Sequence, residues 1–171
     1  MILRDAQVED AEAVAVLGRK AFCAAFAHLY RAEDLDAFLA ASHNPGKVAA
    51  EIAAADMRVH LALSEEGEVL GFCKLVTAYG WPEHARATAG IELKQLYTDP
   101  AATGQGIGAA LMEWALGQAR ELAAHEIQLS VWSGNHGAQR FYHRHGFAKV
   151  ADIHFMVGEQ RDEEFLFARL L

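Results

Sequence analysis

The chain has 171 residues, a length typical of one domain, so we expect residues 1–171 to fold as a single domain with a real core. Hydrophobic residues make up 53% and charged residues 22%, which predicts a globular soluble protein. The net charge of −8 argues against a nucleic-acid partner, which would favour a basic face. No apolar run has transmembrane length and no signal peptide is evident, so we expect a cytoplasmic protein that does not bind a membrane.

Cysteine and histidine give no indication of a metal site. The two cysteines, Cys23 and Cys73, lack C-x-x-C spacing, and the nine histidines show no H-E-x-x-H or comparable pattern. We therefore expect no metal and no disulfide framework, and both cysteines as small buried apolar residues.

The first third of the chain predicts a short strand and then helices. A strand over residues 1–4 precedes a helix that opens at 8–11, and shorter helices are expected over 34–41 and 47–55. Pro45 can end a turn or occupy the first position of the third helix. An aromatic stripe on the first helix indicates either core packing or one wall of a substrate cleft; its members are Phe22, Phe26, Leu29 and Tyr30.

The middle of the chain predicts strands. Residues 59–63 and 69–78 form an antiparallel hairpin, 79–86 a loop, and 88–98 a third strand. Regular alternation in that third strand would place Ile91, Leu93, Gln95 and Tyr97 on one face and Glu92, Lys94, Leu96 and Thr98 on the other.

The last third predicts a strongly periodic helix over 107–124 and a strand over 127–132. A strand, a helix and a strand in this order imply a crossover between parallel strands. A short helix capped by Ser133 or Asn135 and stopped at Gly146 follows. The chain then predicts a strand over 147–157, broken near residues 151–152, a turn over 158–162 and a final strand over 163–171.

A glycine-rich loop joins the third strand to the long helix. Pro100 ends the strand, and glycines at 104, 106 and 108 precede the helix. Free N–H groups at a helix start, together with the helix dipole, form a ready phosphate site that glycines leave open. The loop has neither dinucleotide-fingerprint spacing nor the lysine of a P-loop, so a tight turn without a ligand remains an alternative.

A second segment completes the pattern. Residues 135–147 read Asn-x-x-Ala-x-x-Phe-Tyr-x-x-x-Gly-Phe, and Thr103-Gly104-Gln105-Gly106-Ile107-Gly108 reads as a variant of [QR]-x-x-G-x-[GA]. With both motifs at this separation, the chain resembles the GNAT superfamily of acyl-CoA-dependent N-acetyltransferases from Met1 to Leu171. The resemblance implies an α/β (α+β) GNAT fold, a mixed central sheet of about seven strands flanked by helices. Thr103 stands where the family usually has Gln or Arg, which predicts weaker acyl-CoA affinity than usual.

The resemblance also implies roles for individual residues around acetyl-CoA, the co-substrate. The backbone along Leu96, Tyr97 and Thr98 would pair with the pantetheine arm as an added strand. The pyrophosphate would lie on backbone N–H groups of the segment Thr103, Gly104, Gln105, Gly106, Ile107, Gly108 and Ala109. Asn135 would bind a pantetheine amide, and Tyr142 would protonate the leaving thiolate; a core aromatic is the alternative for Tyr142.

The general base is left open. Some family members have a catalytic glutamate at the position of Glu92, and half-burial there would raise its pKa. A cross-strand ion pair with Lys or Arg is the equal alternative for Glu92. His60, His84 and solvent water are weaker candidates.

The acceptor is expected to be a small primary amine. Features shared with bacterial polyamine acetyltransferases suggest spermidine or spermine, which an acidic cleft would suit. Attack would be direct, in a ternary complex, since no cysteine lies in either motif. The alternatives are a protein or peptide N-acetyltransferase and a non-catalytic acyl-CoA-binding module. A homodimer is left open.

Overall fold

The computed structural model describes residues 1–171, in which seven strands form one mixed sheet with the order β1-β2-β3-β4-β5-β7-β6. The strands are β1 (Ile2–Asp5), β2 (Met57–Leu63), β3 (Val69–Val76), β4 (Gly90–Thr98), β5 (Glu126–Trp132), β6 (Ala148–Val157) and β7 (Gln160–Leu170). The helices are α1 (Ala11–Phe26), α2 (Ala32–Ser42), α3 (Pro45–Ala53), α4 (Ile107–Glu121) and α5 (His136–Arg144). The predicted α/β fold with about seven strands flanked by helices is confirmed.

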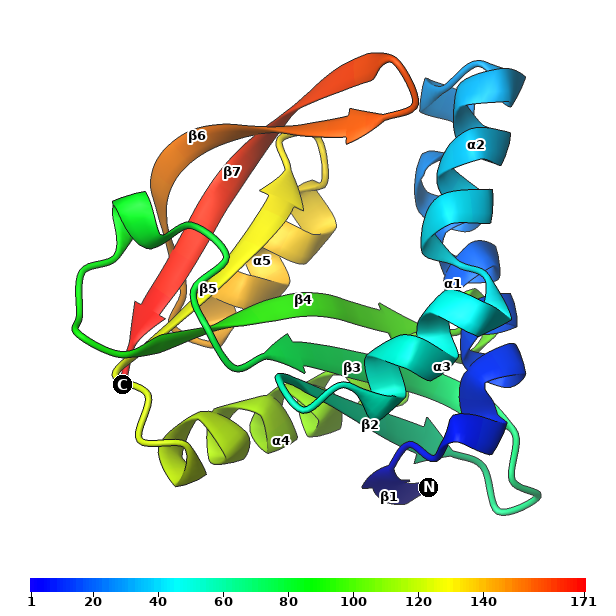
Figure 1. The fold of residues 1–171 in the computed structure, drawn as a ribbon, viewed down its shortest axis with the longest axis horizontal. Coiled ribbons are helices and arrows are strands. Elements are labelled where there is room, and N and C mark those ends of the chain that lie inside the picture. The colour runs from blue at the N-terminus through cyan, green and yellow to red at the C-terminus, as the bar shows by residue number, and fades with distance from the viewer.

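Helices cover both faces of the sheet (Figure 1). On one face α4 packs on β2, β3 and β4 and buries a core that includes Leu93, Leu111 and Ile127. On the other face α1 and α3 pack together over β2 and β3, and their core includes Val14 and Phe72. The apolar stripes of α1 and α4 explain this layering, because each helix can bury its stripe only against the sheet. None of the helices is both long and apolar enough to cross a membrane.

The predicted crossover between parallel strands joins β4 to β5 through α4. The two strands pair only over Gly90–Glu92 and Glu126–Gln128, and beyond these residues they diverge (Figure 1). From Leu93 onward β4 therefore has no strand on that side, and a wedge-shaped gap opens in the middle of the sheet.

A β-bulge in β4 changes the predicted faces of this strand. Leu75 of β3 opposes Leu93 while Lys74 opposes Gln95, so Lys94 is the extra residue. The bulge reverses the alternation after Lys94: Leu96 joins the α4 core with Leu93, whereas Tyr97 packs toward α1. The prediction that Gln95 and Tyr97 share the face of Ile91 and Leu93 was wrong, because alternation alone cannot reveal a bulge.

The hairpin of β6 and β7 is tighter than predicted. Its turn is only Gly158–Glu159 instead of 158–162, because Gly158 adopts a left-handed φ of 58° that closes the turn at once. This turn meets the start of α2, where the Glu159 N–H donates to Asp34 at 3.0 Å. Tyr30, which precedes α2, donates from its hydroxyl to Asp162 of β7. The tip of the β6–β7 hairpin therefore lies beside α2, above the diverging strands (Figure 1).

Candidate active site

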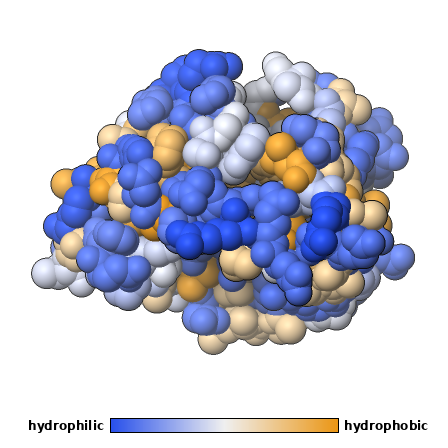
Figure 2. Space-filling view, turned by 90° about the horizontal axis from the view of Figure 1, so that it is seen from above, coloured by the Kyte–Doolittle hydropathy of each residue, from blue (hydrophilic) through white to orange (hydrophobic).

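A cavity of about 560 Å³ lies where β4 and β5 separate. Its lining comes from α1, α2, α3, β4, the end of β5, α5, β6 and β7. Figure 2 shows a mainly polar surface with apolar residues visible where it is hollowed. The cavity brings together six residues predicted for the site from two segments, β4 and α5 with its cap: Glu92, Leu96, Tyr97, Thr98, Asn135 and Tyr142. The predicted phosphate-binding residues 103–109 lie outside this lining, at the start of α4.

The glycine loop has the geometry of an anion site. Gly104 and Gly106 have φ values of 83° and 79°, and a Cβ atom at either position would meet nothing within 4 Å. No side chain caps the first turn of α4, whose first backbone bond runs from the Ala110 N–H to the Gly106 carbonyl. The N–H groups of residues 107–109 therefore remain available for a phosphate group.

Side chains of the loop serve the fold. The Thr103 hydroxyl donates to the Pro100 carbonyl at 2.9 Å, and Ile107 is buried in the core beneath α4. Gln105 is exposed to solvent. Phosphate contacts in this loop thus fall mainly to the backbone, since no side chain of residues 103–109 is charged and only the exposed Gln105 amide could add a donor.

The edge of β4 that faces the gap offers unpaired backbone groups. The Asp99 N–H donates to the Leu70 carbonyl of β3 at 2.8 Å, so by alternation Tyr97 also points toward β3. Leu96 and Thr98 then point their backbone groups the other way, into the gap left by β5. An extended chain bearing amides could pair with β4 there, as an added strand does.

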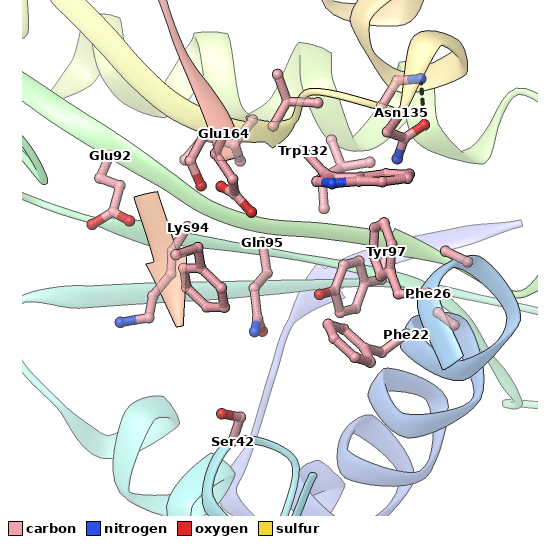
Figure 3. A pocket seen from close by; sticks show the side chains of 18 of the residues that line it. Phe22, Phe26, Ser42, Glu92, Lys94, Gln95, Tyr97, Trp132, Asn135 and Glu164 are labelled. Atoms are coloured by element: carbon pink, nitrogen blue, oxygen red, sulfur yellow. Dashed lines mark hydrogen bonds between the residues drawn. The ribbon is translucent and has the colours of Figure 1, made fainter. Parts of the chain in front are cut away.

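Asn135 caps α5. Its Oδ1 accepts from the Ala138 N–H at 3.1 Å, which uses only the oxygen of the amide. Its amide nitrogen forms no hydrogen bond within the protein and points toward the cavity in Figure 3. Asn135 can therefore cap α5 and donate to a ligand at the same time.

Tyr142 projects from α5 into the cavity and packs on the core through Phe147, with ring centroids 6.0 Å apart. Its hydroxyl has no hydrogen-bond partner among the protein groups. Burial raises the pKa of Tyr142, and the nearby Cys73 and Glu164 raise it further. The hydroxyl is protonated at neutral pH and free to donate a proton to a bound group.

Glu92 lines the cavity and forms no ion pair. A Cβ atom at residue 80 would lie 2.8 Å from Glu92 Cδ, so the carboxyl packs against the Gly80 backbone. Burial raises the pKa of Glu92, and Lys94 partly opposes this rise. The cross-strand ion pair considered from the sequence is absent. Of the weaker candidates, His60 binds Asp5 and stacks on Trp114, and neither His60 nor His84 lines the cavity.

Glu164 on β7 was missed by sequence reasoning. It lines the cavity and points to its centre (Figure 3), opposite Trp132 in the β5–β7 register. Burial raises its pKa, while a hydrogen bond from Ser130 opposes the rise. The alternation of β7 could have predicted this position. Glu164 lies on the same face of the strand as Leu166 and Ala168, both of which are buried, so its carboxylate is expected on the inner face of β7.

These features together fit a phosphate-bearing acyl thioester. The anion site lies at the glycine loop, the open edge of β4 leads from it, and the cavity with Tyr142 follows. An arm lying along β4 would pass between β4 and β5, which leaves the space between α1, α2 and the β6–β7 hairpin for a second substrate.

The acetyltransferase (GNAT) family matches this chain over residues 21–147. The chain is 28% identical over 155 residues to a protein of Lactobacillus delbrueckii subsp. lactis named as an uncharacterized N-acetyltransferase, covering 91% of this chain and 88% of that one. Among solved structures, PaiA N-acetyltransferase from Thermoplasma acidophilum in complex with coenzyme A has a TM-score of 0.82 at 21% identity, covering 99% and 98% of the two chains. A ribosomal-protein-alanine N-acetyltransferase from Brucella melitensis has a TM-score of 0.68 at 19% identity over all of both chains.

The fold and the extent of the match define a GNAT acyltransferase. The chain belongs to the GNAT family and is an N-acetyltransferase that uses acetyl-CoA.

Proposed function

We propose that this enzyme acetylates a small-molecule primary amine by direct attack in a ternary complex. The observation that carries the proposal is the continuity of the cavity from the open edge of β4 to a space lined by α1, α2 and the β6–β7 hairpin. The hydrogen bonds from Tyr30 to Asp162 and from the Glu159 N–H to Asp34 hold the hairpin against α2 on one side of that space and narrow the room for a peptide there. A small molecule therefore suits the site better than a protein acceptor.

Bound acetyl-CoA supplies the acetyl thioester. In the proposal the N–H groups of residues 107–109 hold its pyrophosphate, and the backbone of Leu96 and Thr98 binds its amide-bearing arm. The Asn135 amide nitrogen donates to the same arm. This assignment is supported by the free donors at each of these positions.

Tyr142 acts in the proposal as the proton donor to the leaving thiolate. Its unpartnered hydroxyl and its place between the gap and the cavity support this role. Removal of the acceptor's proton needs a base, and the two carboxylates of the cavity without an ion pair, Glu92 and Glu164, are the candidates.

A polyamine acceptor, suggested by the sequence, is supported by these two carboxylates and by the net charge of −8. The same lining holds Lys47 and Lys94, neither in an ion pair, and a molecule with several ammonium groups would meet both cations. The cavity as a whole is therefore not the strongly acidic cleft that a polyamine favours.

The test is release of free CoA from acetyl-CoA with purified protein and a panel of amines. The panel contains spermidine, simple monoamines, an amino acid and an N-terminal peptide. Acceptor-dependent turnover with a small amine and none with the peptide is expected. Tight acetyl-CoA binding without turnover of any amine would refute the proposal.

A further inference from the structure

Glu164 is the carboxylate that faces the acceptor half of the cavity. Its neighbours on β4 and α5 are Tyr97 and Tyr142, whose pKa values it raises through charge. Its one polar partner is Ser130, and no cation of the protein neutralises it. A carboxylate held this way inside a cavity is an incomplete pair, since a buried charge is costly until a cation or proton joins it.

An aromatic wall continues from this carboxylate around the end of the cavity. Consecutive ring centroids lie 6.1, 5.0, 4.5 and 5.8 Å apart along the series Trp132, Phe26, Phe22, Phe38 and Phe155. These five residues come from β5, α1, α2 and β6, and all of them line the cavity. Figure 3 shows Phe22, Phe26, Tyr97 and Trp132 gathered at one end and Glu164 beside them.

The opposite end of the cavity carries two lysines and one carboxylate. Lys47 and Lys94 each lower the pKa of buried Lys74, so both lie near Lys74, and Glu92 lies beside Lys94 (Figure 3). The Glu51 carboxylate at this end is already paired with Lys74, with 2.5 Å between Oε2 and Nζ. An ammonium is therefore accommodated beside Glu164 and the aromatic rings, where cation–π attraction adds to charge pairing. A second ammonium further along would meet Lys47 and Lys94, whose two charges outnumber the single free carboxylate of Glu92.

We infer that the acceptor is a monoamine with an apolar body, whose ammonium binds Glu164 and whose body lies on the aromatic wall. The inference rests on the proposed function.

Glu164 takes one proton from the ammonium and leaves the lone pair on nitrogen for attack. As the N–C bond forms and the C–S bond breaks, the thiolate takes the hydroxyl proton of Tyr142. The acylated nitrogen then gives up its extra proton to the Tyr142 oxygen, which restores the hydroxyl. One proton per turnover reaches solvent from Glu164.

The first experiment compares kcat/KM of the unaltered enzyme for 2-phenylethylamine, ethylamine and spermidine. Burial of the phenyl ring should raise kcat/KM for 2-phenylethylamine by about 10-fold or more over ethylamine. Spermidine should fall below 2-phenylethylamine. A higher kcat/KM for spermidine overturns the inference and leaves the proposed function standing, whereas no turnover of any amine overturns both.

The second experiment tests the residue with Glu164→Gln, which keeps the side-chain shape. This variant should lose about 100-fold in kcat/KM for 2-phenylethylamine and keep its acetyl-CoA affinity by calorimetry. Glu163→Gln is the matched control, because Glu163 immediately precedes Glu164 on β7, is 66% exposed and faces His154. Equal losses in the two variants, or a large loss confined to Glu92→Gln, would overturn the assignment to Glu164.

Discussion

The ion pair beneath the cavity allows a sharp stability prediction. Lys74 Nζ and Glu51 Oε2 are 2.5 Å apart, and their side chains are 0% and 10% exposed. Burial lowers the pKa of Lys74 and the bond to Glu51 opposes that change. Glu51→Leu conserves the approximate size of the side chain and leaves Lys74 buried without a partner.

The magnitude follows from the state that Lys74 can then adopt. Keeping a lysine with the ordinary pKa of about 10.4 neutral at pH 7 costs roughly 4.6 kcal/mol. This cost is the upper limit of the destabilisation, because unpaired Lys74 can lose its proton instead of remaining charged. Removing one partner of a buried pair typically costs about 3–5 kcal/mol, so the two estimates agree. For a protein of this size the melting temperature should fall by roughly 10 °C.

Urea denaturation at pH 7 measures this change, with Glu51→Leu/Lys74→Met as the control. The double variant removes both charges and should recover most of the lost stability. In Glu51→Leu the folded pKa of Lys74 lies below its unfolded value, so the unfolded state binds more protons and stability rises with pH. A loss below about 1 kcal/mol in the single variant, or an equal loss in the double variant, would refute the electrostatic explanation.

Three further predictions concern the site. Tyr142→Phe should lower kcat about 100-fold and leave acetyl-CoA binding by calorimetry unchanged; an unaltered kcat would remove Tyr142 as the proton donor. Burial, with a contribution from Asp162, raises the pKa of Glu164, so kcat/KM for the amine should fall as pH drops through a value above that of a free glutamate. Glu164→Gln should lack this acid limb, and its persistence would assign the limb elsewhere. Thr103→Arg should bind acetyl-CoA about 10-fold more tightly, measured against Thr103→Val, which loses the bond to Pro100 without adding charge; equal affinities would contradict this.

Local signals predicted the donor side of the site. Gly104 and Gly106 were recognisable because their left-handed φ values favour glycine, and the run of the strand into the loop and helix α4 is encoded in consecutive residues. Asn135 likewise lies at a helix start that it caps itself. Their roles toward acetyl-CoA remain predictions, but their placement needed only neighbours in the chain.

The faces of β4 were predictable only as far as the bulge. Up to Leu93 the alternation holds, and after Lys94 it is reversed, so Leu96 faces α4 and Tyr97 faces α1. A bulge depends on pairing with β3, a strand about twenty residues away, and no residue type in β4 predicts it.

The sequence by itself determined the family, the order of the elements and the residues beside the glycine loop, because each depends on contacts within a short stretch of chain. Tertiary structure decided the acceptor side. Glu164, Trp132 and Phe38 lie on β7, β5 and α2, and only the divergence of β4 from β5 and the closure of α2 on the β6–β7 hairpin bring them around one cavity. The glycine loop and the cap of α5 depend on neighbours in the chain and are therefore predictable from sequence, whereas the cavity is assembled from distant segments whose meeting depends on how the whole sheet packs.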